Sequence, residues 1–223
     1  MLLQEKLDAF TDGLLKSGAI PNDVVEILFK ATSDLVASKE AEKALKAGQP
    51  APSFSLKDAD GNVVDSKKLL ASRPLVVTFY RGVWCPYCNI DLKALEAARP
   101  LIEAKGASLV ALSMQNAPNS RRSARENGLG FPILVDKHGK VADAFGLRFK
   151  LSPTVVKVYR DVLKNDLEAF NDDTSWTLPM PARYVIAQDG VIAYAEVNPD
   201  FTRRPDPSEL FPVLDQLART RAA

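Results

Sequence analysis

Two cysteines, Cys85 and Cys88, are the only ones in the 223-residue chain, and two residues lie between them in the stretch Trp84-Cys-Pro-Tyr-Cys88. Thiols at this spacing can be joined by a disulfide and separated again, so the stretch is a candidate redox centre. The apolar run 75–80 before it predicts a buried strand, and residues 89–99 after it have the spacing of an amphipathic helix. Cys85 is therefore expected where a strand ends and a helix begins.

The start of a helix favours the reactive form of a cysteine. The unpaired N–H groups and the partial positive charge there stabilise a thiolate, which is the nucleophile. A free cysteine with a pKa of about 8.5 is only roughly 3% ionised at neutral pH, so a lowered pKa greatly increases its reactivity. We predict Cys85 as the nucleophile, with a lowered pKa, and Cys88 as the residue that closes a disulfide with it.

Two other interpretations of the cysteine pair are weaker. A structural disulfide across two residues closes a very small loop and constrains the unfolded chain little. A zinc site needs about four ligands, and the only other soft candidate is the single histidine, His138, which stands in a turn and is expected to be solvated. We therefore predict no metal and no cofactor beyond the dithiol itself.

The composition is that of an ordinary soluble protein, with 46% hydrophobic and 26% charged residues. The formal net charge of +1 gives no indication of nucleic-acid or membrane binding. No apolar run approaches the roughly 20 residues that span a bilayer, and the N-terminus lacks the pattern of a secretory signal. We expect a cytoplasmic protein, and in a reducing compartment a lone Cys-x-x-Cys is typical of catalysis.

The first 47 residues are predicted to form a helical extension. Leu3, Leu7, Phe10 and Leu14 share one helix face, and a second apolar stripe follows from Val24 onward. Short helices with apolar stripes need something to cover them. Two interpretations stay open: a helical hairpin that packs on the rest of the chain, or a homodimer interface.

Strands and helices alternate through the remaining residues, 48–223, and predict an α/β sheet. The predicted strands lie near 54–56, 63–64, 75–80, 108–113 and 131–136, followed by a hairpin over 183–186 and 191–197. Helices are predicted from about 86, with Pro100 as a kink or stop, over 119–127, over 155–167, and from a capping box at 206–209 to about 219.

The segment from 48 to about 217 resembles the AhpC/TSA, or peroxiredoxin-like, branch of the thioredoxin fold. The resemblance rests on Ala51–Gly61, on Phe131–Gly146 and on Tyr184–Ile192. It implies a thioredoxin-like fold, with a mixed central sheet flanked by helices, over residues 48–223, and a thiol-dependent activity.

The loop before the cysteines departs from the peroxiredoxin pattern. Gly82 occupies the position of the usual peroxide-binding Thr, and Pro181 stands where the usual Arg is expected, with Arg183 two residues further on. Trp84 before the first cysteine is similar to thioredoxin, and Cys-Pro-Tyr-Cys is the glutaredoxin form of the motif. Pro181 accordingly resembles the proline that has a cis peptide bond facing the cysteines in thioredoxin-like proteins; the alternative is an ordinary proline at the start of a strand.

Several other residues are candidates for tuning the site. Arg81 could lower the pKa of Cys85 or bind an anionic substrate, or it could be a solvated loop residue. Trp84 is expected to shield Cys85, and Tyr87 and Trp176 could form an apolar rim, with core packing as the alternative. The candidate site therefore comprises Arg81, Trp84, Cys85, Pro86, Tyr87, Cys88, Trp176, Pro181 and Arg183; Arg148 and Lys150 could face the same cleft.

Three functions fit this pattern. The first is reduction of hydroperoxides through a Cys85 sulfenate and a Cys85–Cys88 disulfide, recycled by thioredoxin or glutathione. The second is thiol–disulfide exchange, in which Cys85 attacks a disulfide substrate and Cys88 resolves the mixed disulfide. The third is a non-enzymatic redox sensor whose disulfide changes the exposure of the N-terminal helices.

Overall fold

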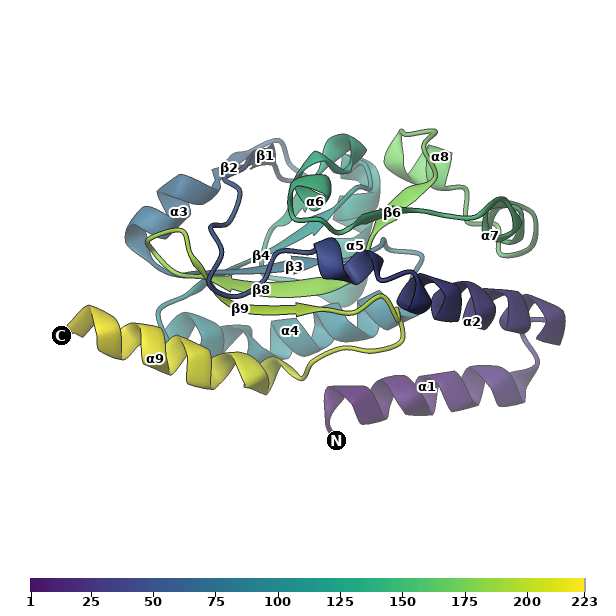
Figure 1. The fold of residues 1–223 in the computed structure, drawn as a ribbon, viewed down its shortest axis with the longest axis horizontal. Helices are drawn as coiled ribbons and strands as arrows, with labels where there is room; N and C mark the ends of the chain where they lie inside the picture. The colour runs from purple at the N-terminus through teal and green to yellow at the C-terminus, as the bar shows by residue number, and fades with distance from the viewer. Residues whose placement is uncertain (223) are drawn as a thin grey trace.

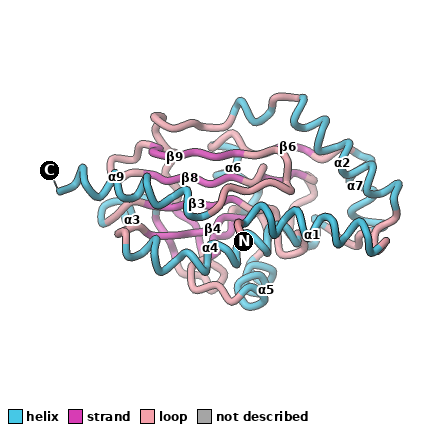
Figure 2. The backbone as a smooth tube through the Cα atoms, turned by 90° about the horizontal axis from the view of Figure 1, so that it is seen from below, coloured by secondary structure: helices cyan, strands magenta, loops and turns pink. Residues whose placement is uncertain are grey.

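A five-stranded mixed sheet forms the centre of the computed structural model, which describes residues 1–222 (Figure 1). The strand order is β5-β4-β3-β8-β9; β3 pairs in parallel with β4, and β4 with β5, whereas β8 is antiparallel to β3 and β9 to β8. Figure 2 shows β9, β8, β3 and β4 side by side. The strands are β3 (Leu75–Phe79), β4 (Ser108–Ser113), β5 (Ile133–Val135), β8 (Ala182–Ile186) and β9 (Ile192–Val197).

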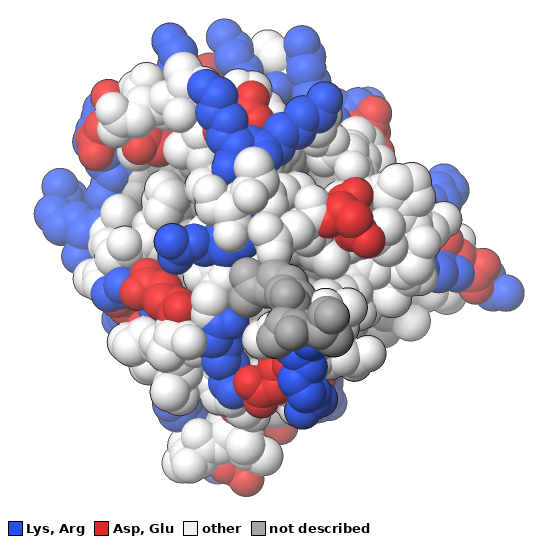
Figure 3. All heavy atoms as spheres, turned by 90° about the vertical axis from the view of Figure 1, so that its left-hand side faces the viewer, with Lys and Arg blue, Asp and Glu red and all other residues white. Residues whose placement is uncertain are grey.

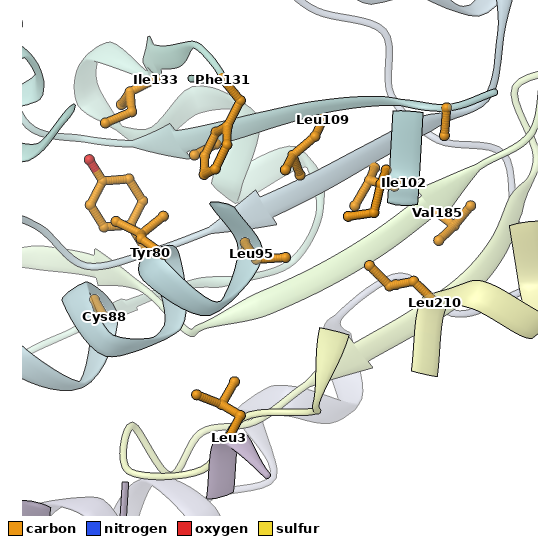
Figure 4. Close-up of a cluster of buried hydrophobic side chains, with 14 of the residues drawn as sticks. Leu3, Tyr80, Cys88, Leu95, Ile102, Leu109, Phe131, Ile133, Val185 and Leu210 are labelled. Atoms are coloured by element: carbon orange, nitrogen blue, oxygen red, sulfur yellow. The ribbon is translucent and has the colours of Figure 1, made fainter. Parts of the chain in front are cut away.

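Helices cover both faces of the sheet and bury its apolar side chains. On one face lie α4 (Pro86–Ala104), α5 (Ala117–Asn127) and α9 (Leu210–Ala222); on the other lie α3 (Ser66–Ser72) and α6 (Lys140–Ala144). Figure 4 shows Leu95 of α4 and Leu210 of α9 in the first of these two cores. Helix α4 continues through Pro100, so the prediction that this proline could stop the helix was wrong.

The N-terminal helices, α1 (Leu3–Ser17) and α2 (Asn22–Ala37), lie against the rest of the chain. Helix α1 packs on α4, where Leu3 and Leu7 are buried, and α2 packs on α7 (Pro153–Lys157). A short helical turn, Glu40–Lys43, follows. The predicted helices and their contact with the main body are confirmed, while a dimer through them stays a prediction.

The segment between β5 and β8 is less regular and carries small elements. After the turn Lys137–Gly139 come α6, β6 (Arg148–Lys150) and α7, which continues as the π-helical turn η3 (Val158–Val162). Helix α8 (Leu167–Asn171) and β7 (Thr177–Pro179) follow, and β7 pairs with β6. The helix predicted over 155–167 therefore ends about five residues early.

A separate hairpin, β1 (Ser55–Lys57) and β2 (Val63–Asp65), precedes α3, and the turn η4 (Pro207–Glu209) leads into α9.

The surface carries charges of both signs. At the end of the molecule seen in Figure 3, basic and acidic side chains are interspersed among uncharged ones. Across residues 1–222, no helix has both the length and the apolar character that crossing a membrane requires.

Candidate active site

The two cysteines lie at the start of α4, as the sequence predicts. Cys85 is the N-cap residue, Pro86 is the first helical residue, and the Cys85 N–H donates to the Gly82 carbonyl at 3.0 Å. Both thiols are reduced and hydrogen-bonded to each other. The Cys85 residue is only 2% exposed and Cys88 is fully buried, and Figure 4 shows Cys88 on α4 beside the apolar core. The pair is therefore shielded from bulk water.

Gly82 allows the loop between β3 and α4 to fold tightly under Trp84. Its φ is +154°, and a Cβ at this position would lie 2.4 Å from Trp84 Nε1. A threonine hydroxyl cannot occupy this position without moving the indole. The loop is held in place by the Val83 N–H, which donates to Gln115 Oε1 at 2.9 Å.

Arg81 is buried beneath three aromatic rings next to the thiols. Its guanidinium carbon lies 4.4 Å from the Phe201 ring centroid, 5.0 Å from that of Trp84 and 5.8 Å from that of Tyr159. It donates a hydrogen bond to the Tyr159 hydroxyl, and its charge acts on both thiols. At 4% exposure it is not the solvated loop residue that was the alternative prediction.

A second arginine, Arg204, reaches Cys88 from the loop between β9 and α9. Its Nη2 donates to Cys88 Sγ at 3.5 Å, and its Nε lies 3.4 Å from Asp91 Oδ2. The other oxygen of Asp91 is paired with Arg183 of β8. Arg183 thus contacts Asp91 and the Pro205 carbonyl, at 2.9 Å, rather than either thiol. The arrangement is a buried Arg–Asp–Arg network with one end on Cys88.

The electrostatics of the two thiols are unequal. Burial raises the pKa of Cys88, but the hydrogen bond with Cys85 and the charges of Arg204 and Arg81 outweigh burial and lower this pKa to about 6. Burial, the hydrogen bond with Cys88 and the charge of Cys88 together raise the pKa of Cys85 well above its usual range. The sequence prediction of a lowered pKa at Cys85 is therefore wrong for the reduced pair, because burial and the neighbouring Cys88 outweigh the charges of Arg81 and Arg204.

An apolar pocket of about 100 Å³ leads to Cys85 from between the N-terminal helices and η3. Tyr87 forms part of its wall, and its hydroxyl lies 2.9 Å from Thr11 Oγ1 of α1. Pro86 and Trp84 also line it, as sequence reasoning placed them near Cys85. Other lining side chains are Leu14, Leu28, Phe29, Leu163 and Phe201. The pocket therefore exists only because α1 and α2 close one side of it.

Three predicted residues, Pro181, Trp176 and Arg183, do not line this pocket. Pro181 lines a larger, adjoining groove of about 860 Å³ with Arg148 and Lys150, and this groove shares Arg81, Tyr159 and Phe201 with the pocket. No peptide bond in the described part of the chain is cis, so the predicted cis bond at Pro181 was wrong. Trp176 is buried in an apolar cluster and donates from Nε1 to Glu168 at 2.6 Å, so it is not part of a rim at Cys85.

His138 also lies outside the site. Its Nδ1 is 2.6 Å from Asp173 Oδ2, and the side chain is 47% exposed, as expected for a turn. Among residues 1–222, no group of three or more His, Cys, Asp or Glu side chains could hold a metal ion.

Sequence reasoning missed the residues that reach the thiols from a distance. Arg204, Phe201 and Tyr159 come from segments more than 70 positions after the cysteines. Asp91 is six positions after Cys85, on a predicted helix, and reads as an ordinary surface carboxylate. The one available signal is that Cys88 and Asp91 are three residues apart and so share a helix face.

The sheet order and the dithiol at the N-terminus of α4 define a thioredoxin-fold redox protein. More specifically, the chain belongs to the AhpC/TSA family, whose profile matches residues 47–195. Among solved structures, peroxidoxin BcpB from Mycobacterium tuberculosis superposes with a TM-score of 0.60 at 19% identity, covering 77% of this chain and 97% of that one. The predicted thioredoxin-like fold is confirmed.

Curated relatives divide between two activities. Thiol-disulfide oxidoreductase ResA of Halalkalibacterium halodurans is 27% identical over 121 residues, which cover 53% of this chain and 67% of that protein. Chloroplastic peroxiredoxin Q of Oryza sativa subsp. japonica is 27% identical over 151 residues, covering 68% of this chain and 58% of that protein. The chain thus spans about six-tenths of the length of the curated relatives it matches, and they support a thiol redox function in general.

Proposed function

We propose that this protein is a thiol peroxidase that reduces hydroperoxides through Cys85 and Cys88. The Cys85 sulfur attacks the terminal oxygen of the hydroperoxide, which breaks the O–O bond and leaves a Cys85 sulfenic acid and an alcohol or water. Cys88 then attacks the sulfenic sulfur, expels its oxygen as water and forms the Cys85–Cys88 disulfide. Thioredoxin or glutathione reduces that disulfide and restores the dithiol.

Access to Cys85 is the observation that carries this proposal. Cys85 lies at the end of a narrow apolar pocket and is only 2% exposed. A small hydroperoxide can enter such a pocket while α1 and α2 stay docked. A folded protein, whether a disulfide substrate or thioredoxin as the reductant, reaches the sulfur only if these helices move.

The backbone next to the site also disfavours a bound polypeptide substrate. A substrate chain that pairs beside the redox centre needs a free backbone edge. Here the Pro181 carbonyl accepts from the Asn198 N–H at 3.1 Å, and the Met180 N–H donates to the Leu147 carbonyl at 2.8 Å. These backbone groups are therefore already paired within the chain.

Stopped-flow tryptophan fluorescence tests the proposal. Trp84 is next in sequence to Cys85, so its emission should change when the fully reduced protein is mixed with hydrogen peroxide or an organic hydroperoxide. We expect oxidation orders of magnitude faster than that of free cysteine, repeated turnover with thioredoxin or glutathione as donor, and loss of both in Cys85→Ser. Oxidation at the rate of free cysteine would remove the peroxidase assignment.

Thiol–disulfide exchange is the second candidate, and a specific observation favours it. Gly82 provides no hydroxyl, and Arg183 is occupied by Asp91, so the residues that resemble the peroxide-binding set of the family do not contact the pocket. In this case the protein should reduce insulin or a glutathione mixed disulfide with a thiol donor and leave peroxide nearly untouched. The two assays on one preparation separate the candidates.

A further inference from the structure

The charges buried around the two thiols do not balance if both thiols are protonated. Three arginines, Arg81, Arg183 and Arg204, are 4%, 1% and 7% exposed, and the buried carboxylate among them is Asp91. Two further carboxylates are half-buried: burial raises the pKa of Glu196, whereas the pKa of Asp206, which acts on Arg183, is lowered. Neither carboxylate is paired with Arg81. A buried cation without a counter-ion is costly, so the arrangement favours a further negative charge nearby.

Geometry places that charge on one particular sulfur. Arg204 donates to Cys88 Sγ, and its position is fixed on three sides: Nη1 donates to the Phe201 carbonyl at 2.9 Å, Nε faces Asp91, and its backbone N–H donates to Gln4 Oε1 at 3.1 Å. The Cys85 sulfur has Cys88 as a hydrogen-bond partner, and Arg81 and Arg204 act on it through their charges. Cys88 therefore has a dedicated cationic donor, and Cys85 does not.

We propose that Cys88, rather than Cys85, holds the thiolate of the reduced protein, and that this thiolate is the base that activates Cys85. Arg204 is a positioning residue in this scheme, oriented by Asp91, which is in turn paired with Arg183. In the reduced protein the negative charge is therefore on the second cysteine of the motif rather than on the first, where the sequence predicts it. Cys85, at the end of the pocket, still attacks the peroxide. The base role rests on the peroxidase proposed above; the location of the thiolate does not.

The proton and electron balance of the scheme is complete. As the Cys85 sulfur attacks the terminal hydroperoxide oxygen, the thiol proton of Cys85 passes to the Cys88 thiolate. The S–O bond forms, the O–O bond breaks and an alkoxide leaves. The Cys85 sulfur loses two electrons, and the peroxide gains them. The alkoxide takes the proton back from the Cys88 thiol and departs as an alcohol. The regenerated Cys88 thiolate then attacks the sulfenic sulfur, forms the disulfide and releases hydroxide, which takes one proton from the buffered solution and becomes water.

The electrostatic directions agree with the geometry. The pKa of Cys88 is lowered to about 6 in spite of burial, and that of Cys85 is raised well above its usual range. The titratable and charged groups that act on Cys88 come from the β3–α4 loop, the β9–α9 loop, η3 and the end of β3: they are Arg81, Cys85, Arg204, Tyr159 and Tyr80. Of these, the two arginines and the hydrogen bond with Cys85 favour the thiolate.

The direct test is a pH titration of the reduced wild-type protein labelled with ¹³Cβ-cysteine. The chain has two cysteines, so two carbon signals appear, and Cys85→Ser assigns them. We expect the Cys88 signal to titrate near pH 6 and the Cys85 signal above the usual range for a thiol. The opposite assignment, with Cys85 titrating below neutrality and Cys88 not, would overturn the proposal.

Arg204→Met tests the positioning role, with Arg203→Met as the matched control. The Arg203 side chain is 54% exposed and lies near Asp8 and Asp200 on the surface. We expect Arg204→Met to raise the Cys88 midpoint by at least about one unit, which is a tenfold fall in the thiolate-to-thiol ratio, and Arg203→Met to leave it in place. Equal midpoints in the two variants would exclude Arg204 as the residue that holds the thiolate. Arg204→Lys should recover part of the shift.

Single-turnover oxidation of Cys88→Ser by peroxide tests the base role. If Cys88 only resolved the sulfenic acid, this variant would oxidise at Cys85 at the wild-type rate. Removing Cys88 also removes the hydrogen bond and the charge that raise the pKa of Cys85, so the Cys85 signal is titrated in the same variant and oxidation is measured below its midpoint. There we expect a fall of at least about tenfold relative to the wild type at the same pH, because no base takes the Cys85 proton. An unchanged rate would exclude the base role. If the wild type itself reacted no faster than free cysteine, the proposed function would fail, and the titration would still decide which sulfur is charged.

Discussion

Asp91→Ala is expected to be among the most destabilising single changes in this protein. Asp91 and Arg183 have side chains that are 3% and 2% exposed, and Asp91 also faces Arg204, whose side chain is 4% exposed. Removing the carboxylate leaves Arg183 buried without its ion-pair partner and leaves Arg204 with Cys88 as its remaining partner. Removing one partner of a buried ion pair lowers the free energy of unfolding by about 3–5 kcal/mol. With an m-value of about 3 kcal/mol/M in urea, the unfolding midpoint should fall by about 1–1.7 M.

The assay is urea unfolding of the reduced protein followed by circular dichroism, with Asp34→Ala as the control. Asp34 pairs with Lys30 on α2 at 2.8 Å, but both side chains are largely exposed, so that removal should cost at most about 0.5 kcal/mol. Equal midpoints for the two variants would refute the argument that Asp91 compensates the buried arginines. An intermediate loss with Asp91→Asn would show that the charge, and not only the hydrogen bonds, stabilises the fold.

Three further changes test other parts of the structure. Leu7→Ala should lower the unfolding free energy by about 2–5 kcal/mol in urea, and by loosening α1 it should speed alkylation of the thiols, because Leu7 is fully buried. Gly82→Ala should cost about 1–3 kcal/mol and shift tryptophan fluorescence, since the added Cβ overlaps the Trp84 indole; an unchanged spectrum would contradict this placement. Asp206→Ala removes a capping box and a 3.0 Å bond from the Leu3 N–H, so it should cost about 1 kcal/mol at pH 7. Burial raises the pKa of Asp206, but its hydrogen bonds outweigh burial and place it below the ordinary value of 3.8, so the difference from wild type should be full above that pH and shrink as the pH falls further.

Local patterns predicted most of the fold because each element carries its own signal. The run 75–79 is buried at every position, the 182–186 and 192–197 strands flank an Asp-Gly turn, and Asp206 and Glu209 form the capping box that the sequence indicates. Of the two outcomes predicted for Pro100, a kink or a stop, the stop was wrong, because a proline inside a long helix is tolerated when the helix packs firmly on both sides of it. Here Leu95 and Ile102 are both fully buried.

The chemistry of the site was predicted only in part, because the decisive contacts join distant segments. The spacing of Cys85 and Cys88 and the strand before them were sufficient to place both thiols at a helix start. The choice of which sulfur is charged depends on Arg204, 116 positions after Cys88, and no local pattern connects these two residues. Pro181 was misjudged for the same reason, since the conformation of its peptide bond depends on the strands around it.

The N-terminal helices and the position of Arg204 depend on each other. The first residues of α1 hold the loop that carries Arg204: Gln4 Nε2 donates to the Thr202 carbonyl at 3.3 Å, Gln4 Oε1 accepts from the Arg204 N–H, and the Leu3 N–H donates to Asp206. The same helix closes the pocket at Cys85 through Thr11 and Leu14. Burying the thiols raises the cost of ionising them, and a fixed buried arginine offsets that cost. A helix that shields the redox pair while holding this arginine in place meets both requirements at once, and it lies outside the family match at 47–195.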